Sequence, residues 1–185
     1  GGMTPRLIAA SEETVRQLEE SSLLVFTGAA HVSGSIHDDI RRSYHEEGSK
    51  TLQAMFALRD AAARMTEALE TGDLQGYADS LGASCRSLYD LHESCDSAEH
   101  RRVFEALGEL ALAGKTCGAG GGGFLLICAK PGRRQECLAR VEKLGARAWP
   151  FEFDFDGVQS EEETPWSEAE VDEFRRLIES GAPQG

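Results

Sequence analysis

The chain has 185 residues, of which 41% are hydrophobic and 28% are charged, and it carries a formal net charge of −13 at pH 7. This mixture is ordinary for a globular protein, and the length fits one domain with a sizeable core. The acidic balance argues against nucleic acid or a membrane surface as a partner, because both favour clusters of Lys and Arg. No apolar run approaches the roughly 18 residues of a membrane-spanning helix.

The N-terminus and the cysteines indicate a cytoplasmic protein. No basic segment followed by an apolar core marks a signal peptide, and the two glycines before Met3 look like an expression remnant, with Met3 as the start. The five cysteines are an odd number without C-x-x-C spacing, so we expect reduced thiols, several of them in the core. The neighbouring His31, His37, Asp38 and Asp39 match no metal-ligand template, and no metal site is predicted.

The first part of the chain predicts two strands, a helix and a loop. Leu7-Ile8 is a candidate short strand, and Ser11 is placed to cap a helix that runs through Glu20. The apolar run 23–26 is typical of a buried strand. It ends in a loop of small residues over 27–35, where the backbone can approach a ligand or another chain.

The middle of the chain predicts three helices. Apolar residues recur at spacings of three and four over 52–69 and again over 74–88, and Gly72-Asp73 separates the two patterns. A third helix is expected over 96–111, where a capping box marks its beginning. The Met and aromatic positions on these apolar faces are expected in the core.

The C-terminal part predicts two strands and two helices. The strand 124–129 leads to Pro131, which suits the first turn of a helix. Aromatic and acidic residues alternate over 149–155, as in a strand with one buried face. The acidic break 160–165 precedes a last helix that Ser167 is placed to cap.

The order of these elements predicts the fold class. Strands and helices mix without a regular β-α-β alternation, which favours an α+β fold: a small, mainly antiparallel sheet with helices packed on one face. The order strand, glycine loop, strand, helix, strand over 114–156 is half of a ferredoxin-like unit.

The most informative segment is Gly114–Ile127, in which six of fourteen residues are glycine. Glycine is retained where the chain must take a positive φ or come close to another group. Consecutive glycines can turn several N–H groups toward one point and so form an anion-binding concavity. We therefore predict a phosphate- or substrate-binding surface made by Lys115, Gly118, Ala119, Gly120, Gly121, Gly122 and Gly123.

Two interpretations of this glycine loop stay open. It is either a backbone surface that completes an active site formed mostly by another domain or chain, or a tight turn that lets a strand and a helix pack closely. Lys115 fits a phosphate partner and equally a solvated lysine. His31 and Ser33 are predicted to face the same cleft, with an ordinary exposed loop as the alternative.

The glycine segment resembles the third conserved motif of the GHMP small-molecule kinases. The pattern G-K-x-x-G-A-G-G-G-G-F is most similar to that of the heptose-phosphate branch of sugar kinases, and the strands 23–28 and 151–157 also fit that branch. The resemblance covers about residues 5–158. It implies that 1–4 are the remnant and start, 5–158 a GHMP kinase C-terminal-like domain, and 159–185 an acidic linker with a C-terminal helix.

The resemblance concerns only the C-terminal half of such a kinase. The other half normally carries a P-x-x-x-G-x-x-S-S-A-type loop around the ATP phosphates and the base that faces the substrate hydroxyl, and neither pattern occurs here. It therefore implies a half or subunit of a sugar kinase that phosphorylates a sugar or sugar phosphate, is inactive alone, and meets ATP and Mg²⁺ only through a partner half. No catalytic residue is assigned within this chain. The implied partner is an ATP-binding kinase half or a second copy of the chain.

Two departures from the family pattern keep an alternative open. The usual Arg of the loop after β-strand 23–26 is His31 here, and a helical W-x-L-K-K pattern is replaced by Cys85-Arg86-Ser87-Leu88-Tyr89. The alternative is a non-catalytic binding or regulatory module with the same fold. A further possibility is a piece of a full-length kinase.

Overall fold

The computed structural model describes residues 6–28, 33–45, 50–158, 167–168 and 172, which fall into two compact units, the first through Phe153 and the second from Asp154. The helices and strands of the first unit are α1 Glu12–Ser21, β1 Ser22–Phe26, α2 Ser33–Tyr44, α3 Lys50–Thr71, α4 Leu74–Leu91, the 3₁₀ turn η1 Glu93–Cys95, α5 Ala98–Leu107, the 3₁₀ turn η2 Gly108–Leu110, β2 Ala111–Thr116, β3 Phe124–Ala129, α6 Arg134–Glu142 and β4 Arg147–Pro150.

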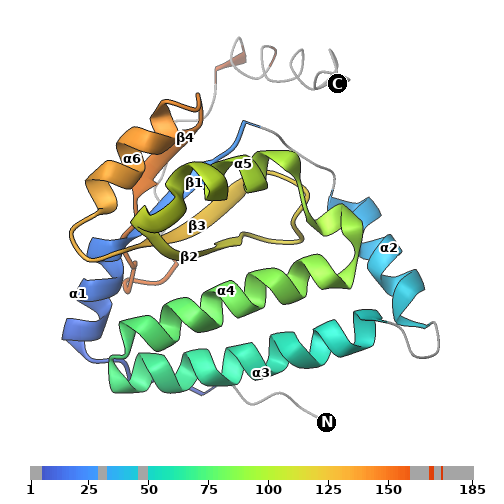
Figure 1. Cartoon of the computed structure of the whole chain (residues 1–185), viewed down its shortest axis with the longest axis horizontal. Coiled ribbons are helices and arrows are strands. Elements are labelled where there is room, and N and C mark those ends of the chain that lie inside the picture. Colours follow the sequence, from blue (N-terminus) through green and yellow to red (C-terminus); the bar gives the residue numbers. More distant parts are fainter. Residues whose placement is uncertain (1–5, 29–32, 46–49, 159–166, 169–171, 173–185) are drawn as a thin grey trace. The chain divides into compact units, whose positions relative to one another are not determined.

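The four strands form one sheet in the order β2-β3-β1-β4 (Figure 1). β1 pairs antiparallel with both β3 and β4, and β2 pairs antiparallel with β3. β3 and β4 therefore run in the same direction with β1 between them, and α6 connects them. This split β-α-β arrangement is the ferredoxin-like half that the order of elements predicts, and the predicted α+β class is confirmed.

One face of the sheet carries the main core. Side chains alternate between the two faces of a strand, so Leu23 and Val25 of β1 lie on the same face as Leu125 and Ile127 of β3. All four are fully buried. Helices α5 and α6 cover this face through Val103, Leu107, Cys137 and Val141.

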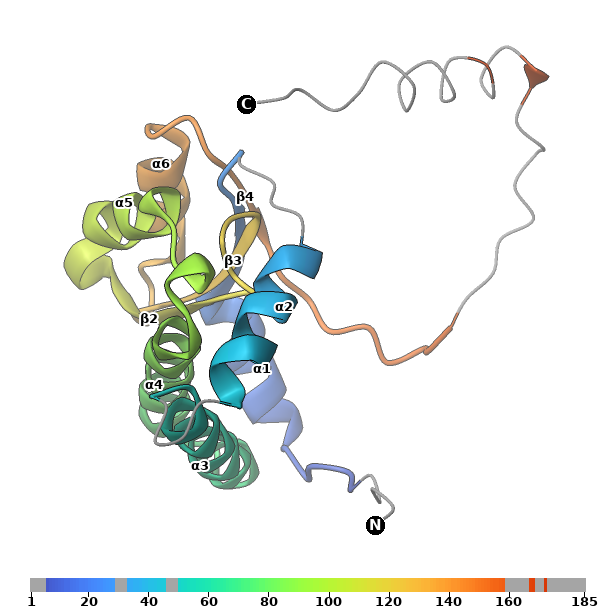
Figure 2. The same cartoon turned by 90° about the vertical axis from the view of Figure 1, so that its right-hand side faces the viewer.

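The opposite face is covered in part by α4, which corrects the expectation of helices on one face only. Ala78 and Leu81 of α4 pack against Cys128 of β3, next to Leu126 and Ala113. α4 in turn packs along α3, and the two helices lie side by side in Figures 1 and 2. The sheet thus has helices on both faces.

Helix α3 turns a different face to the protein from the one that its large residues predict. Its buried positions are the small residues Thr51, Ala54, Ala61 and Ala68. Phe56 is 50% exposed, so the expectation that every large residue of this pattern lies in the core is wrong. Small side chains let α4 approach closely, which outweighs the burial of larger residues on the outer face.

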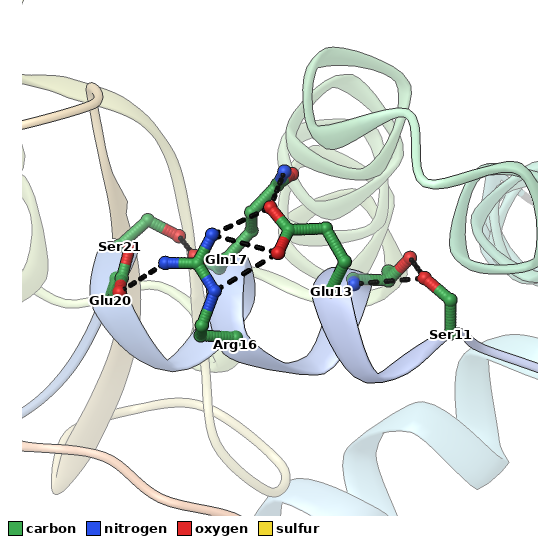
Figure 3. Close-up of polar contacts among 7 residues, drawn as sticks. Ser11, Glu13, Arg16, Gln17, Glu20 and Ser21 are labelled. Atoms are coloured by element: carbon green, nitrogen blue, oxygen red, sulfur yellow. Dashed lines mark hydrogen bonds and ion pairs between the residues drawn. The ribbon is translucent and has the colours of Figure 1, made fainter.

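Helix α1 follows the sequence prediction closely. The Ser11 hydroxyl accepts a hydrogen bond from the Thr14 N–H at 3.1 Å, as an N-cap residue does. Figure 3 shows Arg16 between Glu13 and Glu20, with which it pairs at 2.6 and 2.5 Å on the exposed face. The preceding Leu7-Ile8 is not a strand, and Leu7 is 90% exposed.

Several boundaries differ from the sequence predictions. The predicted loop 27–35 ends early, because α2 begins at Ser33. The third helix ends at Leu107, where Gly108 at φ +47° breaks it, and β2 takes over at Ala111. Pro131 lies in a turn before α6.

The last predicted strand is short. β4 spans Arg147–Pro150 and ends at a proline, which cannot donate to the next step of a ladder. The predicted helix after Ser167 falls largely outside the described residues. No described helix has the length and apolar content needed to cross a membrane.

Candidate phosphate-binding loop

The glycine loop connects the edge strand β2 to β3 (Figure 1). Five of its residues have a positive φ, a conformation that side chains with a Cβ rarely adopt: Gly118 at +75°, Gly120 at +95°, Gly121 at +73°, Gly122 at +149° and Gly123 at +81°. The glycines that the sequence singles out are thus required by the backbone of this loop.

Two neighbouring segments fix the loop. The Gly121 N–H donates to the carbonyl oxygen of Cys95 in η1 at 2.8 Å, and a Cβ at Gly120 would overlap that oxygen. On the other side, the N–H and the hydroxyl of Thr27 both donate to the Gly123 carbonyl at 3.0 Å. Ala119 packs into a small core cluster between α2 and α4.

Most N–H groups of the loop remain available. Among the described residues, no acceptor receives the N–H of Gly118, Ala119, Gly120, Gly122 or Gly123. Gly122 is itself buried, and a buried N–H without a partner is rare in folded proteins. A group of such donors is suited to an anion.

Lys115 and Cys117 lie at the point where β2 enters the loop. The Lys115 ammonium donates to the Thr116 carbonyl at 2.9 Å, so the lysine is held along the strand edge. Cys117 is the exposed cysteine; the other four are buried, and all five are free thiols. Although Cys117 is exposed, the protein atoms around its sulfur partly desolvate it and so raise the pKa of Cys117, and the Lys115 ammonium offsets part of that rise.

An aromatic group lies beside the loop. The Phe26 and Phe124 ring centroids are 4.9 Å apart, and those of Phe124 and Trp149 are 6.3 Å apart. Phe124 directly follows Gly123 in the chain and is 39% exposed. The loop end of the sheet is therefore apolar as well as rich in N–H donors.

The structure brings together only part of the predicted site. Lys115 lies near the end of β2, and the six residues 118–123 belong to the loop that follows this strand. His31 lies outside the described residues, and Ser33 is described only as the first residue of α2. Thr27 and Cys95 support the loop but were not predicted: Thr27 begins the small-residue loop, while no sequence signal links Cys95 to Gly121.

The described residues fit an anion better than a cation. The loop offers N–H donors and a nearby ammonium, which suit a phosphoryl group. No group of three or more His, Cys, Asp or Glu side chains in the described part of the chain could hold a metal ion. We therefore assign no residue of this chain to Mg²⁺.

Comparison with protein families agrees with this geometry. Residues 65–147, which include α4, α5, the glycine loop and α6, match the family model for the C-terminal part of GHMP kinases. The chain contains a GHMP kinase C-terminal domain. The resemblance that the glycine motif indicates is thereby confirmed.

Individual relatives of this GHMP kinase domain include sugar-phosphate kinases. D-glycero-alpha-D-manno-heptose 7-phosphate kinase of Campylobacter jejuni is 31% identical over 145 residues, which are 78% of this chain and 42% of the relative. The solved structure of Lin0012, a protein of Listeria innocua, superposes with a TM-score of 0.67 at 19% sequence identity. The match covers 72% of this chain and 39% of the Lin0012 chain. The structure of D-glycero-D-manno-heptose 1-phosphate kinase of Bacteroides thetaiotaomicron superposes with a TM-score of 0.52 at 24% sequence identity. The match covers 78% of this chain and 36% of that kinase chain. The two structures show the fold alone, and this chain spans less than half of each relative.

Proposed function

We propose that this chain forms the C-terminal part of a GHMP-type sugar kinase and needs a separate ATP-binding half for activity. In this proposal residues 5–158 are the kinase domain, and 159–185 are an acidic linker with a C-terminal helix. The observation that carries it is the set of N–H groups on Gly118, Ala119, Gly120, Gly122 and Gly123, which have no acceptor in the described part of the chain, in a loop that Cys95 and Thr27 hold in place.

The loop would act by positioning and by neutralising charge. Phosphoryl transfer depends on stabilising the charge that spreads over the transferred group. Rigid N–H donors contribute such stabilisation without reorganising at the moment of reaction. ATP and Mg²⁺, held by the partner half, would supply the phosphoryl group, and the loop of this chain would orient the anionic end of a sugar or sugar phosphate.

Two further supports come from this chain and its relatives. The Campylobacter jejuni relative is a heptose 7-phosphate kinase by name, and 42% of its length corresponds to this chain. The five free thiols suit a reducing cytoplasmic setting. The partner is either an ATP-binding half or a second copy of this chain that completes the site.

One observation favours a non-catalytic module instead. The resemblance places basic residues at Leu88 and Tyr89, but Leu88 is buried in the cluster that also holds Ile36 and borders Ala119. Helix α4 therefore has the apolar side chain of Leu88 at a position where the family pattern has a cation. In this second reading the fold and the affinity for an anion persist without catalysis.

The test combines this chain with a separately produced ATP-binding half of the Campylobacter jejuni relative and measures ADP release. We expect release that depends on heptose 7-phosphate and on both polypeptides, and a loss of at least tenfold in the Gly122→Ala variant. Gly132→Ala is the matched control, because Gly132 also has a positive φ (+75°) but lies in the turn before α6. Complex formation without sugar-dependent ADP release would favour the non-catalytic module. Failure of the two polypeptides to form a complex would contradict both the proposed partner and the proposed kinase function.

A further inference from the structure

A cleft separate from the glycine loop lies at the outer edge of β2. It has a volume of about 360 Å³, and its walls come from α4 and α5 while β2 forms its floor. Figures 1 and 2 both show β2 between these two helices. Clefts of this volume are at the lower end of those that bind small molecules.

The backbone at the floor offers a free donor and a free acceptor. The Cys117 N–H donates to the Phe124 carbonyl at 2.8 Å, which makes this pair a hydrogen-bonded one in the antiparallel ladder. In an antiparallel ladder, hydrogen-bonded pairs alternate with non-hydrogen-bonded pairs. The backbone of Lys115 therefore also bonds to β3, whereas the N–H and C=O of Gly114 and Thr116 point away from β3, toward the open edge of the sheet. The outward Thr116 carbonyl indeed accepts from the Lys115 ammonium.

Gly114 is an outward-pointing residue among the three β2 residues of the floor, which are Leu112, Ala113 and Gly114. It is buried, and no described residue supplies a partner for its outward N–H or C=O. A side chain there is excluded, because a Cβ would lie 2.6 Å from both the Phe104 ring and the Ile127 side chain. A buried backbone donor without a partner is unusual and suits a ligand that supplies one.

The rim of the cleft carries a cation and aromatic surface. The Arg86 guanidinium folds over Gly82, 3.3 Å from where a Cβ would sit, and makes no hydrogen bond or ion pair with any described residue. The carboxylate of Asp79 is already engaged by the Gln75 amide at 2.9 Å. Phe104 and Tyr89 provide apolar walls.

We propose that this β2-edge cleft binds a small aromatic acid, that is, a carboxylate or phosphate carried on a flat apolar ring. The anionic group pairs with the Arg86 guanidinium, which binds both kinds of oxyanion in a fork geometry. The ring lies against Phe104 and Tyr89, and a polar substituent or an anion oxygen accepts from the Gly114 N–H. The contacts proposed here do not involve the N–H groups of residues 118–123, since the cleft lies on the edge of β2 opposite to its pairing with β3.

The test is a titration of the full ¹⁵N-labelled chain followed by NMR. The probes are benzoate, 4-hydroxybenzoate and phenyl phosphate, with neutral benzamide and non-aromatic acetate as controls. We expect saturable shifts of the Gly114 amide with at least one aromatic acid; the carboxylate and phosphate arms identify the anion. Benzamide and acetate should bind at least tenfold more weakly.

Variants decide which residue recognises the anion. Arg86→Gln should weaken binding by about tenfold or more, the usual effect of removing a charged hydrogen-bond partner, while Arg102→Gln on α5 should leave it unchanged. Arg86 is exposed, so its replacement should not disturb folding. The proposal is overturned if no aromatic acid gives a saturable Gly114 shift, if benzamide binds equally well, or if Arg86→Gln binds like the wild type.

Discussion

The N–H of Gly121 donates to the carbonyl oxygen of Cys95 at 2.8 Å and joins the glycine loop to the 3₁₀ turn before α5. At the neighbouring Gly120 the two backbones are so close that a Cβ would overlap the same oxygen. The loop is therefore held from a segment about 25 residues earlier in the chain. Its shape therefore depends on η1 as well as on its own glycines.

This contact predicts unequal effects of two glycine substitutions. Gly120→Ala adds both an unfavourable φ of +95° and an overlap with Cys95, whereas Gly132→Ala adds only the unfavourable φ of +75°. The conformational cost alone is about 1 kcal/mol, so Gly120→Ala should destabilise the chain by at least ~2 kcal/mol more than Gly132→Ala. Urea unfolding measures both variants. Equal losses would show that the loop does not rest on η1.

At Thr116 we predict a substitution that does not lower the free energy of unfolding. Its hydroxyl is buried, and no hydrogen-bond partner for it exists among the described residues. Replacing an unsatisfied polar group by an apolar group of the same shape is neutral or favourable. Thr116→Val should leave the free energy of unfolding unchanged or raise it by up to ~1 kcal/mol, while Thr116→Ala should lower it by about 1 kcal/mol through lost packing. A marked loss in Thr116→Val, measured by urea unfolding, would mean that the hydroxyl has a partner.

The sequence predicts the local elements well where one local signal dominates. Ser11 caps α1, and the run 23–26 forms a strand. Prediction fails where tertiary packing decides. Phe56 is left outside because α4 packs on the alanines of α3.

The candidate site is likewise only partly predictable from the sequence. The glycines make the loop predictable because positions with a positive φ strongly favour glycine. The partners of the loop do not: the Cys95 carbonyl is a backbone group that any residue type would supply. Four aromatics at alternate positions predict a long strand over 149–155, but Pro150 ends the ladder.

Cys117 offers a chemical reporter at the entrance to the loop. One equivalent of thiol should react quickly with iodoacetamide in the folded chain, since Cys117 is exposed and the other four cysteines are buried. Partial desolvation of the sulfur by the surrounding protein raises the pKa of Cys117, so the midpoint of the rate against pH should lie above the ordinary thiol value. Lys115→Gln should move the midpoint higher still, because it removes the ammonium that favours the thiolate. A midpoint that falls or stays fixed in this variant would place Lys115 away from the thiol.

Tyr77 predicts a loss of stability in alkali. Burial, with a smaller contribution from Cys128, raises the pKa of Tyr77 to about 12. The unfolded chain ionises this phenol near pH 10 and the folded chain does not, so the contribution present below pH 10 is lost between pH 10 and 12, roughly 3 kcal/mol in all. The unfolding free energy of the wild type should therefore fall relative to that of Tyr77→Phe by up to roughly 3 kcal/mol over this range. A difference that is constant with pH would contradict the burial of the phenol.

The most direct test of the central claim is a titration of the ¹⁵N-labelled chain with inorganic phosphate. The amide signals of Gly118, Ala119, Gly120, Gly122 and Gly123 should shift to saturation, while that of Gly121 should shift least because its N–H already donates to Cys95. Added salt and Lys115→Gln should both weaken the binding. Shifts that never saturate, or that are as large at Gly121 as at its neighbours, would show that the glycine loop is a structural turn and not a phosphate site.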